Sequence, residues 1–131
     1  MLLHLSSDHN THPELWFRPV PQMSGRGIVA LINCGTLIAT PRLGKRDESH
    51  EKGFAPGQQV TLRVFDHQDA EHWRKKVRIV GLRIKLLSGL TLDDLHGTLY
   101  HHWEEVQSDL SYFERRLVAP NEHTTIVRFA I

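Results

Sequence analysis

The sequence contains almost no cysteine, no long apolar run and almost no net charge. Its single cysteine, Cys34, cannot form an intramolecular disulfide, as is typical of proteins from a reducing compartment. No apolar run approaches the roughly 20 residues that a membrane-spanning helix needs. The apolar residues within 1–5 are too few for a signal peptide. We therefore expect a soluble, cytoplasmic protein with no membrane partner.

The near balance of charge excludes a further class of protein. The chain has 16 Lys and Arg against 15 Asp and Glu, a formal net charge of +1 with its ten His counted as neutral. A protein that binds nucleic acid regardless of sequence normally carries a larger basic excess, so any basic site must be local. Length and composition suit one domain over residues 1–131, with the turn-forming residues 1–13 as a flexible lead-in.

Alternating apolar and polar residues predict the strands of a sheet. Residues 59–65 have the clearest alternation, and residues 75–87 form the longest predicted strand. The period of that strand slips next to Gly81, which predicts a β-bulge. Residues 124–131 are apolar on both faces and predict a central strand, while the prolines in 14–20 suit an edge strand.

Two segments predict helices and complete an α+β fold. The apolar run 27–34 is too short for periodicity to separate strand from helix, but Gly35 directly after it favours a helix with a glycine C-cap. A helix over residues 98–118 is predicted by apolar residues spaced four and three apart: Leu99, Trp103, Val106, Leu110, Phe113 and Leu117. The bend in the longest strand favours a curved, mainly antiparallel sheet.

Residues 35–49 are the predicted binding loop, because small, hydroxyl and basic residues here separate two core-forming segments. Arg42 and Arg46 offer planar forks of donors that suit phosphates or base edges, and Lys45 adds a point charge. The alternative is a solvated loop whose cations are neutralised by nearby acidic residues: Asp47, Glu48 and Glu51.

Residues 14–131 resemble an ASCH domain, a member of the PUA-like barrel superfamily. The family signature is Gly-x-Lys-x-x-Glu-x-Arg after a helix. One branch, similar to the bacterial N(4)-acetylcytidine amidohydrolases, has Thr in place of the Glu and continues with Asp-Glu-Ser. Gly35, Thr40 and Arg42 are in register with that branch, and Asp47-Glu48-Ser49 follows after four extra residues. The position of the signature Lys is occupied by Leu37.

The resemblance implies a PUA-like, curved, mainly antiparallel β-barrel with flanking helices and a cleft beside the 35–49 loop. It implies a module that binds RNA or a modified nucleoside. A protein-interaction domain is a further alternative, but the sequence shows no exposed apolar stripe, so no obligate protein partner is expected. The residues that would contact this ligand are Gly35, Thr40, Arg42, Lys45 and Arg46.

The alternative function is an amidohydrolase acting on an acylated nucleoside such as N(4)-acetylcytidine, with ribonuclease activity as a further enzymatic variant. Thr40 would be its nucleophile. Since Leu37 cannot take the proton from a Thr hydroxyl, Lys45 or Glu104 would have to be the base.

Neither a metal nor another cofactor is expected. No two of the histidines have the His-x-x-x-His spacing that places two ligands on one helical face, and a Cys pair is absent. Among the aromatic residues, Trp16, Phe17 and Trp73 are candidates for stacking on a base, with packing in the core or at the barrel mouth as the alternative.

Overall fold

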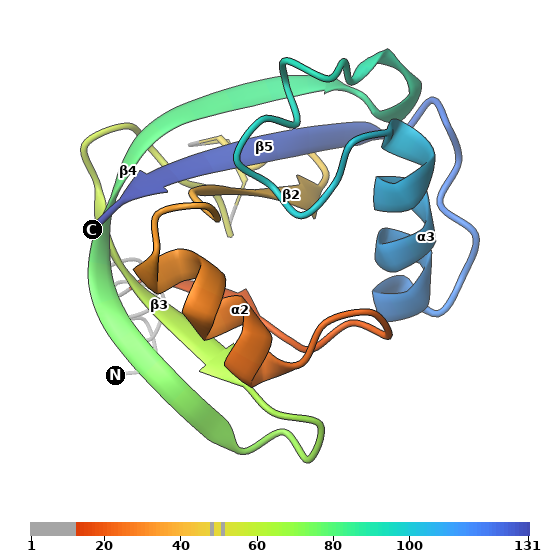
Figure 1. Ribbon diagram of the computed structural model, residues 1–131. Helices are drawn as coiled ribbons and strands as arrows, with labels where there is room; N and C mark the ends of the chain where they lie inside the picture. The colour runs from red at the N-terminus through yellow and green to blue at the C-terminus, as the bar shows by residue number, and fades with distance from the viewer. Residues whose placement is uncertain (1–12, 48, 51) are drawn as a thin grey trace, which may run out of the picture.

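The computed structural model describes residues 13–47, 49–50 and 52–131, so the predicted lead-in lies outside the described residues except for Pro13. One curled sheet with two α-helices makes up this part of the chain (Figure 1). In chain order the elements are β1 (Glu14–Phe17), α2 (Gly25–Asn33), β2 (Ala39–Leu43), β3 (Gln59–Phe65), β4 (Glu71–Leu86), the 3-10 turn η1 (Leu87–Gly89), α3 (Trp103–Glu114) and β5 (His123–Ala130).

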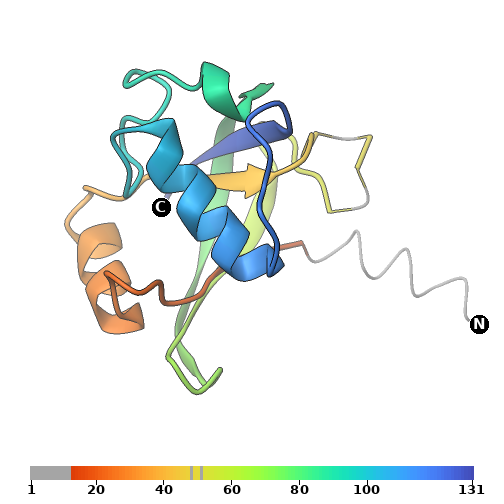
Figure 2. The same cartoon turned by 90° about the vertical axis from the view of Figure 1, so that its right-hand side faces the viewer.

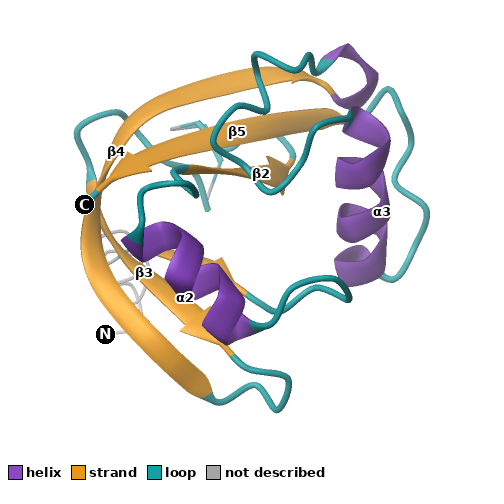
Figure 3. Cartoon of the chain, viewed as in Figure 1, coloured by secondary structure: helices purple, strands orange, loops and turns teal. Residues whose placement is uncertain are grey.

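The strand order is β1-β3-β4-β5-β2, which leaves β1 and β2 as the two edges of the sheet. The pairing of β1 with β3 is parallel and the other three pairings are antiparallel. The sheet curls into a half-barrel with α2 on its concave side and α3 at its open side (Figure 3). The α+β class and the curved, mainly antiparallel sheet are therefore confirmed.

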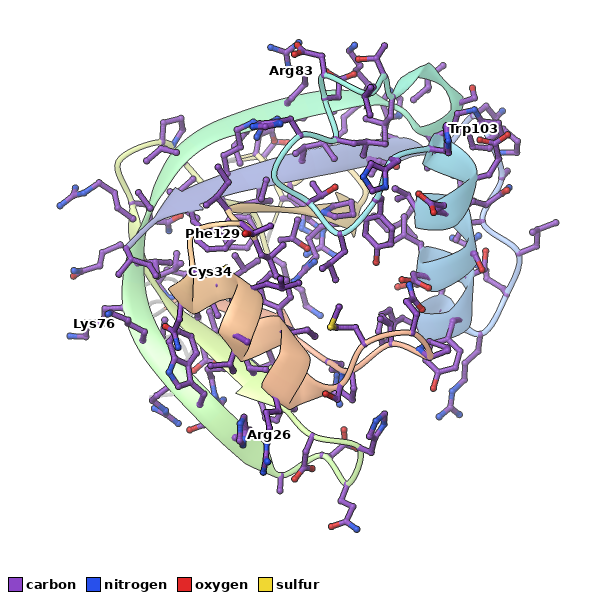
Figure 4. All side chains as sticks on the ribbon, viewed as in Figure 1. Arg26, Cys34, Lys76, Arg83, Trp103 and Phe129 are labelled. Atoms are coloured by element: carbon purple, nitrogen blue, oxygen red, sulfur yellow. The ribbon has the colours of Figure 1, made fainter. Side chains whose placement is uncertain are left out.

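The curl depends on β4, which spans 16 residues and changes partner along its length. Its first half pairs with β3 and its second half with β5. The register with β5 shifts between Ile79 and Gly81, so the predicted bulge is confirmed. Side chains along the curved sheet divide between its two faces: Phe129 on β5 points into the half-barrel and Lys76 on β4 points away from it (Figure 4).

Both predicted helices form, and the bounds of both differ from the prediction. Helix α2 begins after Ser24, whose hydroxyl accepts a hydrogen bond from Gly27 N–H at 3.1 Å. Helix α3 is shorter than the predicted 98–118 at both ends: it begins after its N-cap residue His102, and it stops at Arg115, which has the left-handed conformation with φ of 57°. Consequently Leu117 lies outside the helix and is 77% exposed. No helix in the described part of the chain is both long enough and apolar enough to cross a membrane.

The predicted binding loop over residues 35–49 is in part a strand, because β2 occupies its middle. Thr40 and Arg42 lie on this strand, which pairs antiparallel with β5. Pro41 is compatible with β2 because β2 is an edge strand and one side of its backbone needs no ladder partner.

Buried apolar side chains form two clusters. The first fills the space between α2 and the concave face of the sheet and includes Ile28, Ile32 and Leu62. The second connects α3 and η1 to the second half of the sheet, with Val106 and Ile126 fully buried. The region between these clusters, beside the two edge strands, contains the candidate site.

Candidate functional site

A cavity of about 880 Å³ lies where both edge strands meet α3. Figure 2 views this open side, with α3 crossing in front of the sheet. The volume is within the range of small-molecule pockets, roughly 300–1,000 Å³. The lining residues with polar or aromatic groups that matter here are Trp16 and Phe17 on β1, Thr40 and Arg42 on β2, Arg46 after it, Tyr100 before α3, and Asp109 and Glu114 on α3.

The Arg42 side chain connects the two edge strands. Its Nη1 donates to Thr40 Oγ1 at 2.6 Å and to the Pro41 carbonyl at 2.7 Å, and its Nη2 donates to the Trp16 carbonyl. The guanidinium also lies over the ring of Phe17, 5.3 Å from the centroid. Thr40 and Arg42 are two residues apart on a strand, so their side chains leave the same face.

The charges of Arg42 and Arg46 have no carboxylate within ion-pair distance among the described residues. Burial, and then the charge of Arg46, lower the pKa of Arg42 to about 10, so it remains a cation at neutral pH. Burial also lowers the pKa of Arg46, an effect that the charge of Glu114 opposes. Arg46 Nε donates to the Leu43 carbonyl at 2.7 Å. A ligand with acceptor groups would find two partly desolvated cations here.

Asp109 supplies a buried carboxylate to the same cavity. Its Oδ2 accepts from the Tyr100 hydroxyl at 2.6 Å and from Gln22 Nε2 at 3.0 Å. Burial, and then the hydrogen bond to Asp109, raise the pKa of the Tyr100 hydroxyl, which therefore stays protonated and donates. The sequence analysis missed all three residues. One signal was available: Asp109 lies directly before Leu110 and three residues after Val106, so it shares the buried face of α3.

The mouth of the cavity is aromatic on the α3 side. Tyr112 and Phe113 are 59% and 40% exposed, and their rings meet edge to face with centroids 5.2 Å apart. On another part of the rim Arg18 forms an ion pair with Asp69 at 2.5 Å. The lining side chains carry equal numbers of formal charges of each sign: Arg18, Arg42, Arg46 and Arg115 against Asp66, Asp69, Asp109 and Glu114.

Two solved structures are similar in fold to this chain over nearly all of its length. The ASCH domain from Lactobacillus crispatus JV V101 has a TM-score of 0.56 and 11% identity, covering 98% of this chain and 91% of that chain. The chain has an ASCH-like fold. Protein EF3133 from Enterococcus faecalis V583, of the family DUF984, has a TM-score of 0.62 and 14% identity, covering 98% of this chain and 87% of that chain. The sequence matches no protein-family model and no curated protein.

Within this ASCH-like fold the predicted site residues divide into two groups. Thr40, Arg42 and Arg46 line the cavity, and so do Trp16 and Phe17. Lys45 and Glu104 are exposed and are not part of the lining, whereas Gly35 ends α2 with φ of 80°. Trp73 packs against the core beside α2.

Leu37, at the position of the signature Lys, is 1% exposed and packs in the core cluster beside α2. Its side chain is not part of the cavity lining. Within the part of the chain that the structure describes, no three His, Cys, Asp or Glu side chains are grouped so that they can hold a metal ion. The cavity lining offers hydrogen bonding, ion pairing and aromatic contact, with the Thr40 hydroxyl as its candidate nucleophile.

Proposed function

We propose that the cavity binds one unstacked base, carried by RNA or by a modified nucleoside. The observation that supports this most directly is that one cavity contains groups of opposite charge, the partly buried Arg42 and the buried Asp109, beside the ring of Phe17. A base presents hydrogen-bond donors and acceptors on its edge and a π-face on each side. Its edge can bond to the charged groups of the cavity, and its face can stack on an aromatic ring.

The balance of charge in the lining favours recognition of a base over recognition of a phosphate backbone. A surface that binds nucleic acid through phosphates needs a local excess of cations, and this cavity has as many carboxylates as guanidinium groups. Duplexes are disfavoured because they hide the base edges. The exposed ring of Tyr112 at the mouth offers a platform for a second base if the ligand is a strand.

The test compares free nucleosides with the same bases in short single-stranded RNA by calorimetric titration at two salt concentrations. Arg46→Ala removes one cation of the cavity and should weaken binding about 10- to 100-fold, the worth of a charge-assisted hydrogen bond. Lys45→Ala is the matched control, since Lys45 is exposed and outside the lining. Lys45→Ala should leave nucleoside binding unchanged, and unfolding midpoints should show that both variants fold.

The two sources of the base give different results in this test. If RNA is the ligand, it binds more tightly than the nucleoside, its affinity falls with salt, and Lys45→Ala reduces that salt dependence. If a modified nucleoside is the ligand, single-stranded RNA binds no more tightly than the free nucleoside. If neither the nucleosides nor the RNA produces a heat of binding at millimolar concentration, the proposal is contradicted.

A second candidate is hydrolysis of an acylated nucleoside such as N(4)-acetylcytidine. One observation favours it: Thr40 Oγ1 lies in the cavity 2.6 Å from Arg42 Nη1, a cation that would stabilise a developing alkoxide. Neither Lys45 nor Glu104 lines the cavity, so a lining carboxylate would have to take the hydroxyl proton. Release of acetate that persists in Thr40→Ser and disappears in Thr40→Val would support this candidate, and wild-type release equal to the uncatalysed rate would reject it.

A further inference from the structure

Asp109 has one carboxylate oxygen committed to the protein and one that is not. Both of its hydrogen bonds, from Tyr100 and from Gln22, end on Oδ2. Oδ1 has no hydrogen-bond partner within residues 13–47, 49–50 and 52–131. The whole residue is only 6% exposed, so this oxygen belongs to a side chain that is almost entirely removed from bulk solvent.

The free oxygen is open to the cavity and not sealed inside the protein. Among the described residues, Thr124 Oγ1 is the one fully enclosed side-chain nitrogen or oxygen without a partner. Asp109 Oδ1 is therefore accessible, and Asp109 is part of the cavity lining. An acceptor that faces the cavity without a protein partner is available to a donor group of a ligand.

We propose that Asp109 is the residue that selects the base: its Oδ1 accepts a hydrogen bond from an exocyclic amino group. The inference rests on the proposed function, because it assigns the specificity of the same cavity. Cytosine and adenine carry such an amino donor, whereas uracil and hypoxanthine carry a carbonyl acceptor at the same position. A carbonyl oxygen placed against Oδ1 would leave two acceptors facing each other without a proton between them.

The two hydrogen bonds to Oδ2 suggest a substitution that tests the role of Oδ1. In Asp109→Asn, a side-chain carbonyl in the place of Oδ2 keeps both hydrogen bonds, from the Tyr100 hydroxyl and the Gln22 amide, without a turn of either partner. The amide nitrogen then replaces Oδ1 and presents a donor to the cavity. This variant should therefore reverse the preference, from amino-bearing bases to carbonyl-bearing bases, without a change in side-chain volume.

The experiment measures the dissociation constants of cytidine against uridine and of adenosine against inosine by calorimetric titration. For whichever of the two pairs fits the cavity, we expect the wild type to bind the amino-bearing nucleoside about tenfold or more tightly than the other. This ratio corresponds to the free energy of one hydrogen bond to a charged group. Asp109→Asn should prefer the other member of the same pair. Tyr100→Phe is the companion variant: it removes one of the two donors that orient residue 109, and should reduce the reversal when combined with Asp109→Asn.

Nucleoside analogues keep the inference testable if Asp109→Asn does not fold. N(4)-methylcytidine retains one N–H and should bind, while N(4),N(4)-dimethylcytidine has none and should not. A wild type that binds nucleosides without preference between the paired bases would overturn this inference and leave the proposed function standing. A wild type that binds no nucleoside and no RNA would overturn both.

Discussion

The guanidinium group of Arg42 donates a hydrogen bond to the backbone carbonyl of Trp16, and this contact joins the two edge strands of the curled sheet. The sheet order gives β1 and β2 no backbone ladder with each other. A side chain therefore connects the edges where a closed barrel would have strand pairing. Because Arg42 also lines the cavity, closure of the half-barrel and formation of the candidate site depend on the same residue.

Arg42→Lys should lower the free energy of unfolding by about 1.5–3 kcal/mol, because one ammonium cannot replace a planar fork that reaches three acceptors. Urea unfolding measures the loss. Arg26→Lys is the control, since Arg26 is exposed on α2, and it should stay within about 0.5 kcal/mol of the wild type. An unchanged unfolding midpoint for Arg42→Lys would show that the edges hold together without this contact.

Two buried threonines should respond to the same substitution in opposite directions. Thr40→Val leaves an Arg42 N–H facing a methyl group and should cost about 1–3 kcal/mol. Thr124 Oγ1 is enclosed without a partner, so Thr124→Val should be neutral or stabilise the protein by about 1 kcal/mol. Thermal and urea unfolding of the two variants give the comparison, and the prediction fails if both shift stability in the same direction.

Restoring the signature lysine should damage the protein. Leu37→Lys places an ammonium group in the core cluster beside α2, where Leu37 is 1% exposed, and should cost about 3 kcal/mol or more. Leu37→Met, of similar volume, should cost less than about 1.5 kcal/mol. A stable Leu37→Lys variant that gained activity on N(4)-acetylcytidine would show that this side chain can turn into the cavity.

Low pH should destabilise the segment between α3 and β5, because it protonates the Glu122 carboxylate. The carboxylate accepts two hydrogen bonds from Arg116, each of 2.8 Å, and one from Ala119 N–H at 2.7 Å. Arg116, and then Ala119 N–H, lower the pKa of Glu122 from 4.5 to about 2. Because the folded-state pKa is depressed, the contribution of Glu122 is complete above about pH 4.5 and is lost as the pH falls toward 2.

Glu122→Gln should therefore flatten the fall in unfolding free energy between pH 4.5 and 2, measured by urea titration in steps across that window. Glu104→Gln is the control, because Glu104 is exposed on α3 and has no ion-pair partner among the described residues. Equal slopes for the wild type and Glu122→Gln would contradict the assignment.

The helices and strands that follow a local sequence pattern were predictable. The residues at which they end were less predictable. The alternation in 59–65 predicts β3 with the bounds that it has, and the period slip beside Gly81 predicts the bulge. The end of α3 was missed because the apolar spacing continues to Leu117, whereas Arg115 already leaves the helical conformation. Hydrophobic spacing predicts which face of a helix is buried more reliably than where the helix stops.

The site was only partly predictable, because its residues come from segments far apart in the chain. Arg42 and Arg46 were identifiable from their chemistry within one stretch. The hydrogen bond between Gln22 and Asp109 joins residues 87 positions apart, and no local pattern contains both. Lys45 and Glu104 had suitable chemistry, but their exposed positions do not bring them into the cavity.

The sequence by itself determined the α+β class, the central position of the last strand and the bulge, because each follows from the periodicity of a few neighbouring residues. The helix over 27–34 was favoured only by the glycine that follows it. Only the tertiary structure decided which side chains share the cavity. The curl of β4 brings β1 and β2 together, so Trp16 meets Arg42, and the packing of α3 against β2 brings Asp109 to the same cavity. It also decided that Leu37 faces the core, because burial of an apolar side chain outweighs any match to a motif.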